Sequence, residues 1–142
     1  MPDPTVAALA AELRQAVFRT HRRVRSATGT AAVSFPQFSV LASLTREGPT
    51  TPGRLAEIEQ VQPPTMTRTV NSLVELGLVS KTGHPDDGRQ VVIALTAAGQ
   101  AEIAETVRRR DEWLTSRVEL LAPEDREVLA RAAQLLKDMA AS

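Results

Sequence analysis

Apolar residues in the first part of the chain recur every three to four positions, the spacing of one face of an α-helix. The first stripe predicts a helix over about residues 4–27, and it consists of Val6, Leu9, Leu13, Val17 and Val24. A second helix is predicted to begin after Ser34, because Ser34 and Gln37 have the spacing of a capping box. Gly48 and the proline after it end this helix.

A short third helix is predicted by Thr51, a good N-cap residue, and by Pro52 at the first helical position. This helix ends near Glu59. Pro64 disfavours a helical conformation at the residue before it, so Gln62 and Pro63 are expected to be extended. The fourth helix therefore begins at Pro64.

The apolar stripe of the fourth helix indicates which of its sides is buried. It consists of Met66, Val70, Leu73 and Val74, and the helix ends at Gly77. The residues between the stripe positions face outward and can donate hydrogen bonds; they are Thr65, Arg68, Thr69 and Ser72.

After the fourth helix the hydrophobic period changes from helical to two residues. Alternating side chains predict a strand over residues 90–95, pairing with residues 78–81, and the Gly-, Pro- and Asp-rich residues 82–89 form the hairpin tip. Thr96 caps a long helix and Pro123 opens a last one. The fold class is therefore mainly α with a small two-stranded β wing, in one domain over residues 1–142.

The order helix, short helix, helix and hairpin is the layout of a winged helix-turn-helix core, over about residues 35–96. In such a core one helix enters the DNA major groove. Arg68 on the fourth helix is the side-chain type that reads guanine, and Arg89 on the hairpin tip suits a minor groove. Sequence-specific binding of double-stranded DNA is the function that this layout favours.

Composition and charge narrow the alternatives. Hydrophobic residues make up 42% and charged residues 24% of the 142 residues, and the formal net charge is zero. No apolar run reaches the roughly 18 residues that a membrane span needs, so we expect a cytoplasmic protein without a membrane partner. The neutral charge leaves a second interpretation open, namely a winged-helix module that binds proteins and not DNA.

No catalytic or metal site is evident in the sequence. There are no cysteines, and His21 and His84 are far apart, so we expect no metal, no cofactor and no thiol-based redox sensing. Paired catalytic carboxylates, a nucleophile elbow and a phosphate-binding glycine loop are absent. We therefore expect no enzymatic activity.

The segment LAEIEQVQPPTMTRTVNSLVELGLVSKTGHPDDGRQVVIALTAAG resembles the winged-helix core of MarR-type transcriptional regulators. The shared features are Leu-Ala before the turn, Thr-Arg on the recognition helix, Gly-Leu-Val into the wing, Asp-x-Arg at the wing tip and a closing Leu-Thr-x-x-Gly. The resemblance extends over the whole chain. It implies that the helices over about residues 4–27 and 97–140 form a dimerisation module.

The resemblance also identifies a set of DNA-contacting residues. Pro64, Thr65 and Arg68 match positions that meet bases or phosphates, and Asp87 orients Arg89 in the wing. Gly88 stands where many relatives have a second arginine, so we expect the wing to contribute modestly. The full predicted DNA-binding set is Gln62, Pro63, Pro64, Thr65, Arg68, Thr69, Ser72, Lys81, Asp87 and Arg89.

The sequence also carries signals for the assembly and regulation of the protein. Apolar stripes at both ends of the chain exceed what one short helix-turn-helix covers, which predicts a homodimer. A homodimer is expected to read a pseudo-palindromic operator, and the resemblance to MarR-type regulators implies that the protein acts as a repressor. The family often senses small aromatic compounds, which makes an aromatic effector a possible partner. Candidate walls of an effector cleft are Phe18, Phe38 and Trp113.

Overall fold

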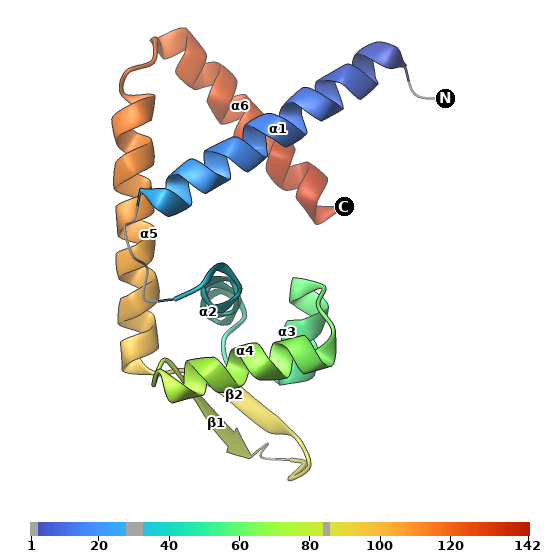
Figure 1. Cartoon of the computed structure of the whole chain (residues 1–142), viewed down its shortest axis with the longest axis vertical. Coiled ribbons are helices and arrows are strands. Elements are labelled where there is room, and N and C mark those ends of the chain that lie inside the picture. The colour runs from blue at the N-terminus through green and yellow to red at the C-terminus, as the bar shows by residue number, and fades with distance from the viewer. Residues whose placement is uncertain (1–2, 28–32, 84–85) are drawn as a thin grey trace. The chain divides into compact units, whose positions relative to one another are not determined.

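The computed structural model describes residues 3–27, 33–83 and 86–142, and its elements follow the predicted order (Figure 1). In these residues the helices are α1 (Pro4–Ser26), α2 (Phe35–Glu47), α3 (Pro52–Glu59), α4 (Pro63–Glu75), α5 (Ala97–Val118) and α6 (Pro123–Ala141). The strands are β1 (Val79–Gly83) and β2 (Val91–Leu95). The predicted fold class, mainly helical with a two-stranded antiparallel wing, is confirmed.

The chain forms two compact units. The winged unit comprises Thr30–Arg108, and the helical unit comprises Met1–Gly29 together with Arg109–Ser142. The long helix α5 contributes its first half to the winged unit and its second half to the helical unit.

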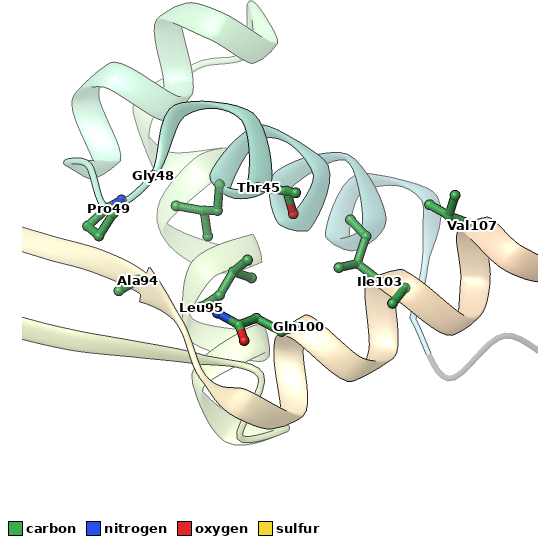
Figure 2. A pocket seen from close by; sticks show the side chains of 10 residues that line it. Thr45, Gly48, Pro49, Ala94, Leu95, Gln100, Ile103 and Val107 are labelled. Carbon is green, nitrogen blue, oxygen red and sulfur yellow. The ribbon is translucent and has the colours of Figure 1, made fainter.

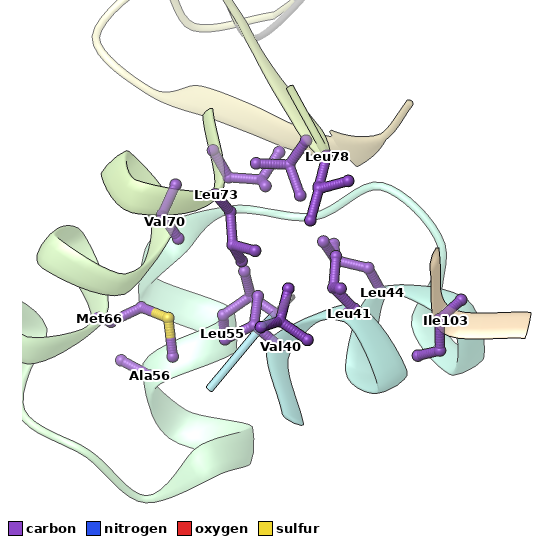
Figure 3. Close-up of a cluster of buried hydrophobic side chains, with 13 residues drawn as sticks. Val40, Leu41, Leu44, Leu55, Ala56, Met66, Val70, Leu73, Leu78 and Ile103 are labelled. Atoms are coloured by element: carbon purple, nitrogen blue, oxygen red, sulfur yellow. The ribbon is translucent and has the colours of Figure 1, made fainter. Parts of the chain in front are cut away.

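The hydrophobic core of the described residues lies in the winged unit, where side chains from α2, α3, α4, β2 and the start of α5 meet (Figure 3). Leu41, Leu55, Leu73 and Ile93 are completely buried. Complete burial of such a side chain stabilises the fold by roughly 1.5–3 kcal/mol. The core consists of Val33, Val40, Leu41, Leu44, Leu55, Ala56, Met66, Val70, Leu73, Leu78, Val79, Ile93 and Ile103.

The predicted helix starts are present as hydrogen-bonded caps. Ser34 Oγ accepts a hydrogen bond from the Gln37 amide at 3.3 Å, and Gln37 Oε1 accepts one from the Ser34 amide at 2.8 Å, which completes the capping box of α2. Thr51 Oγ1 accepts from the Arg54 amide at 3.2 Å at the start of α3. Gly48 ends α2 with a φ of 76°, a conformation that glycine adopts without strain.

Hydrogen bonds connect the end of α4 to the start of α5. Gly77 has a φ of 74°, and the amides of Gly77 and Leu78 donate to the carbonyls of Val74 and Leu73 at 2.9 and 3.0 Å. This pair of bonds is a Schellman motif, which satisfies carbonyls at the helix end. Thr96 Oγ1 donates to the Gly77 carbonyl at 2.6 Å and accepts from the Gly99 amide at 3.0 Å, so the predicted cap of α5 also joins α4.

The wing is an antiparallel hairpin in which Val79 pairs with Leu95 and Gly83 pairs with Val91. The sequence-based limits were wrong by one or two residues. The first strand covers 79–83 and not 78–81, and the second begins at 91 and not 90. The cross-strand hydrogen bonds continue into the segment assigned to the tip, and His84 lies outside the described residues.

A third segment pairs with the wing and was missed by the sequence analysis. Thr50, in the loop before α3, forms a bridge with Ile93 of β2, with N–O distances of 3.0 and 2.7 Å. This bridge attaches the base of the wing to the end of α2.

The predicted start of α4 was also wrong. The helix begins at Pro63 and not at Pro64, and Gln62 is the extended N-cap residue with a ψ of 145°. Two consecutive prolines fit here because the first helical amides have no partner within the helix. The preference against a helical residue before proline is outweighed at this position.

The helical unit carries no buried residue in α1 or α6 among the residues that the structure describes. Large apolar side chains are exposed on both helices, including Val6, Leu9 and Phe18 on α1 and Val128 and Met139 on α6. No helix in the described ranges is long and apolar enough to cross a membrane.

Candidate nucleic-acid interface

Helices α3 and α4 form the helix-turn-helix. The turn depends on Gln60, which adopts a left-handed conformation with a φ of 55°, and on the Val61 amide, which donates to the Ala56 carbonyl at 3.1 Å. Met66 and Val70 anchor the inner side of α4 in the core, with 2% and 0% exposure. The opposite side of α4 is therefore held in a defined orientation and faces solvent.

The exposed side of α4 carries most of the predicted contact residues. Pro64, Thr65 and Arg68 are exposed, and Arg68 Nη2 lies 3.4 Å from Thr65 Oγ1, to which it donates a hydrogen bond. Thr69 and Ser72 are only half-exposed.

The hydroxyl groups of Thr69 and Ser72 make hydrogen bonds within the winged unit. Thr69 Oγ1 donates to the Thr65 carbonyl at 3.1 Å, and Ser72 Oγ donates to the Thr69 carbonyl at 2.7 Å. Ser72 Oγ also accepts from Gln37 Nε2 of α2 at 3.0 Å. Each of these hydroxyl protons is used by a main-chain carbonyl, so both side chains offer an oxygen acceptor to a ligand and not a free donor.

The first turn of α4 has fewer amide donors than an ordinary helix. Pro63 and Pro64 occupy the first two positions and have no N–H group, and Gln62 makes no side-chain cap. Thr65 supplies the first amide of this helix. Contacts from α4 therefore depend on side chains more than on main-chain amides.

Two exposed residues of α4, Thr67 and Asn71, were not predicted as contacts. Asn71 Oδ1 accepts a hydrogen bond from Lys81 Nζ of β1 at 2.5 Å, which joins α4 to the wing. The same helical spacing that selected Arg68 also places both residues on the outward side. Lys81 was a predicted DNA contact, and in this structure it orients Asn71.

The wing tip is ordered by Asp87. Its Oδ1 accepts a hydrogen bond from the Arg89 main-chain amide at 3.0 Å, and its carbonyl accepts from the Gln90 amide at 3.1 Å. This arrangement is an Asx-type turn, in which a carboxylate replaces a main-chain acceptor. Asp87 and Arg89 are both exposed.

The interface carries little positive charge. Arg68, Lys81 and Arg89 are the basic residues of α4 and of the described part of the wing. The nearby Arg54 of α3 is paired with Glu57 at 3.3 Å. Any affinity of this surface for nucleic acid must therefore depend on the placement of a few cations and not on a broad basic surface.

The three predicted effector-contacting aromatic residues are divided between the two units. Phe38 packs against the core of the winged unit. Phe18 and Trp113 belong to the helical unit and contact arginines, with Arg22 5.8 Å from the Phe18 ring and Arg117 5.2 Å from the Trp113 ring.

A pocket of about 590 Å³ lies within the winged unit, between the end of α2, the end of β2 and the start of α5 (Figure 2). The sequence analysis did not anticipate it, because its walls come from three separate segments. Most of its lining is apolar, and Gln100 and Thr45 add polar groups. The lining residues are Leu44, Thr45, Gly48, Pro49, Ala94, Leu95, Gln100, Ile103, Ala104 and Val107. In the described part of the chain, no group of three His, Asp or Glu side chains could hold a metal ion.

Comparison with known proteins agrees with this geometry. The family model described as the MarR family matches residues 33–91. An uncharacterised HTH-type transcriptional regulator of Mycobacterium bovis is 43% identical over 131 residues, covering 92% of this chain and 91% of the relative. A corresponding regulator of Mycobacterium leprae is 42% identical, covering 94% and 93%.

Solved structures share the fold. A MarR family protein from Bacillus stearothermophilus superposes with a TM-score of 0.87 at 27% identity, covering 100% of this chain and 99% of that chain. BpsR from Bordetella bronchiseptica, whose DNA binding is regulated by 6-hydroxynicotinic acid, has a TM-score of 0.74 at 22% identity, covering 100% and 99%. The chain belongs to the MarR family of helix-turn-helix transcriptional regulators.

Proposed function

We propose that the chain is a homodimeric repressor that binds a specific double-stranded DNA operator in the cytoplasm, with α4 in the major groove and the wing in the adjacent minor groove. The observation that carries this proposal is α4 itself. Its inner side is buried in the core, and its outer side presents Thr65, Arg68 and Asn71 as a polar surface. Side chains of these types on a rigid helix are suited to base edges and phosphates.

Exposed apolar surface supports the dimer. Val128, Leu129, Leu135 and Met139 of α6 are 46–65% exposed, and α1 carries a similar set. Val128, Leu135 and Met139 recur at helical spacing along α6. An exposed apolar stripe of this kind is typical of an interface. A second copy of the chain is the occupant that the family implies, and it places two recognition helices about 10–10.5 base pairs apart on a pseudo-palindrome.

The dimer is tested by Leu135→Glu, which places a charge on the exposed apolar side of α6. We expect light scattering to give twice the chain mass for the wild type and a smaller mass for this variant. Gln134→Glu, on a polar neighbouring position, is the matched control and should remain dimeric. A wild type that is monomeric at micromolar concentration would contradict the dimer.

The operator is tested by selecting ligands from a random duplex library with the full-length protein. We expect an enriched pseudo-palindromic motif, loss of enrichment in Arg68→Ala, and binding that weakens with salt. A promoter carrying the selected site upstream of a reporter gene should be less active when the protein is present. No enrichment would favour the alternative winged-helix module that binds proteins.

Regulation by a small aromatic effector is supported by the pocket in the winged unit and by the effector of BpsR. A volume of about 590 Å³ is within the usual range of ligand sites. The pocket is an alternative to a cleft lined by Phe18, Phe38 and Trp113. A panel of aromatic acids should change Trp113 fluorescence or the melting temperature.

Two substitutions distinguish the two effector sites. Ala104→Phe fills the pocket and should abolish the ligand response without affecting DNA binding, whereas Phe18→Ala should leave the response unchanged if the pocket is the site. The opposite pattern would assign the effector to the aromatic cleft. A panel without any response would contradict regulation by aromatic acids.

A further inference from the structure

Thr67 of α4 is an exposed threonine whose hydroxyl group is already used by the helix. Its Oγ1 donates a hydrogen bond to the Pro63 carbonyl at 3.0 Å, one helical turn back. A hydroxyl carries one proton, so this bond leaves the side chain without a free donor. The exposed side chain can then offer DNA only its methyl group and the acceptor lone pairs of its oxygen.

Thr67 lies next to the predicted base-reading residue in the sequence of α4. Thr67 precedes Arg68, and both are exposed on a helix whose inner residues Met66 and Val70 are buried. Thr69 makes the same type of bond, to the Thr65 carbonyl at 3.1 Å, but it is only half-exposed. Thr67 is therefore the threonine of this pair that is more available to DNA.

We propose that Thr67 determines part of the operator specificity by placing its methyl group against the C5-methyl group of a thymine in the major groove. This inference rests on the proposed binding of α4 in that groove. In unmodified DNA, thymine is the base that presents a methyl group there, and apolar side-chain groups recognise it by contact. A phosphate contact through the Thr67 hydroxyl would instead require the bond to Pro63 to break.

The effect of this methyl contact on the affinity for DNA can be predicted. Removing one buried methyl group from an apolar contact weakens association by roughly fourfold. This effect is small enough that the protein still binds, so it can be measured as a ratio of two affinities for the same protein.

The test is a uracil scan of the duplex selected from the random library. Each thymine is replaced singly by uracil, which removes the C5-methyl group and preserves the base-pairing edge. We expect the wild type to bind roughly fourfold more weakly at one or two positions per half-site. Measurements with Thr67→Ser, which lacks the methyl group, and Thr67→Val, which keeps it and lacks the hydroxyl, identify the residue responsible.

The two variants are complementary because Thr67→Ser removes the methyl group and keeps the hydroxyl, whereas Thr67→Val keeps the methyl group and replaces the hydroxyl with a second methyl. Thr67→Ser should bind the thymine and uracil duplexes equally at the sensitive positions, whereas Thr67→Val should keep the wild-type ratio. A flat scan in a protein that still selects a specific motif would overturn this inference and leave the proposed function intact. An unchanged ratio in Thr67→Ser would also overturn it, and selection of no motif would contradict the proposed function itself.

Discussion

Gly99, at the start of α5, is a helical position where alanine should destabilise the protein. A Cβ atom added there would lie 2.0 Å from the Leu78 carbonyl oxygen and 3.0 Å from its carbonyl carbon. The same oxygen accepts a hydrogen bond from the Thr96 amide at 3.1 Å. Ordinary contacts between carbon and oxygen are about 3.3–3.6 Å long, so the main chain must move by more than about 1 Å.

Two effects of opposite sign determine the size of the change. Alanine is favoured over glycine inside a helix by about 1 kcal/mol. Overpacking of a tight contact costs about 1–3 kcal/mol. The upper part of this range, about 2–3 kcal/mol, applies here because the neighbouring atom is a main-chain oxygen that already accepts from the Thr96 amide. We therefore expect Gly99→Ala to lower the free energy of unfolding by about 1–2 kcal/mol.

Gly53 of α3 is the matched control, because the nearest heavy atom to its added Cβ would be Thr51 Oγ1 at 4.0 Å. Gly53→Ala should raise the free energy of unfolding by about 0.5–1 kcal/mol. Urea unfolding followed by circular dichroism compares the two variants at one fixed protein concentration, since the proposed dimerisation would make stability depend on concentration. If Gly99→Ala is stabilised as much as Gly53→Ala, the close approach of α5 to the Leu78 carbonyl is wrong.

Three further predictions concern other parts of the chain. Arg68→Ala should lose about 1–3 kcal/mol of binding free energy for the selected operator and should no longer discriminate between bases at one position. Arg89→Ala should weaken binding to the operator and to a scrambled duplex by similar factors. Titrations of both duplexes at two salt concentrations measure these effects. Glu59 of α3 accepts hydrogen bonds at 2.6 and 2.5 Å from two serines of α2. In urea unfolding, Glu59→Gln should therefore destabilise the protein by about 1–3 kcal/mol. The exposed control Glu57→Gln should destabilise it by at most about 1 kcal/mol. Burial and two nearby arginines lower the pKa of His21 from its usual value of 6.5. As the pH falls below 6.5, the unfolded chain binds a proton at His21 before the folded chain does, so the free energy of unfolding should fall. This fall should be smaller in His21→Gln.

Most helix boundaries, though not the start of α4, were predictable because their signals act over a few residues. Ser34 with Gln37, Thr51 before Pro52 and Gly77 each satisfy or replace main-chain bonds of their own helix end. The strand limits were less accurate, since the length of a hairpin depends on cross-strand pairing and not on local spacing alone.

The contacts that connect the elements were not predictable in the same way. Thr50 bridges Ile93, and Lys81 binds Asn71 across the gap between the wing and α4. The Thr50–Ile93 pair forms through main-chain groups, which every residue carries. Lys81 and Asn71 are residue types that are common on any protein surface. Such pairs arise from the tertiary arrangement, which also determines the walls of the winged-unit pocket.

The buried core residues belong to the winged unit, which carries the proposed DNA-binding helix, and not to α1 and α6, which carry the proposed dimer interface. The described core lies within the winged unit, so a single chain can hold α4 and the wing in place. Helices α1 and α6 have no buried residue within the described ranges, and in the proposed dimer a second copy would bury their apolar sides. One winged unit with few cations should bind DNA weakly, whereas two linked units gain affinity because the second contact becomes intramolecular. Operator occupancy should therefore follow the concentration of the dimer, and substitutions on α6 should reduce DNA binding without altering which sequence is preferred.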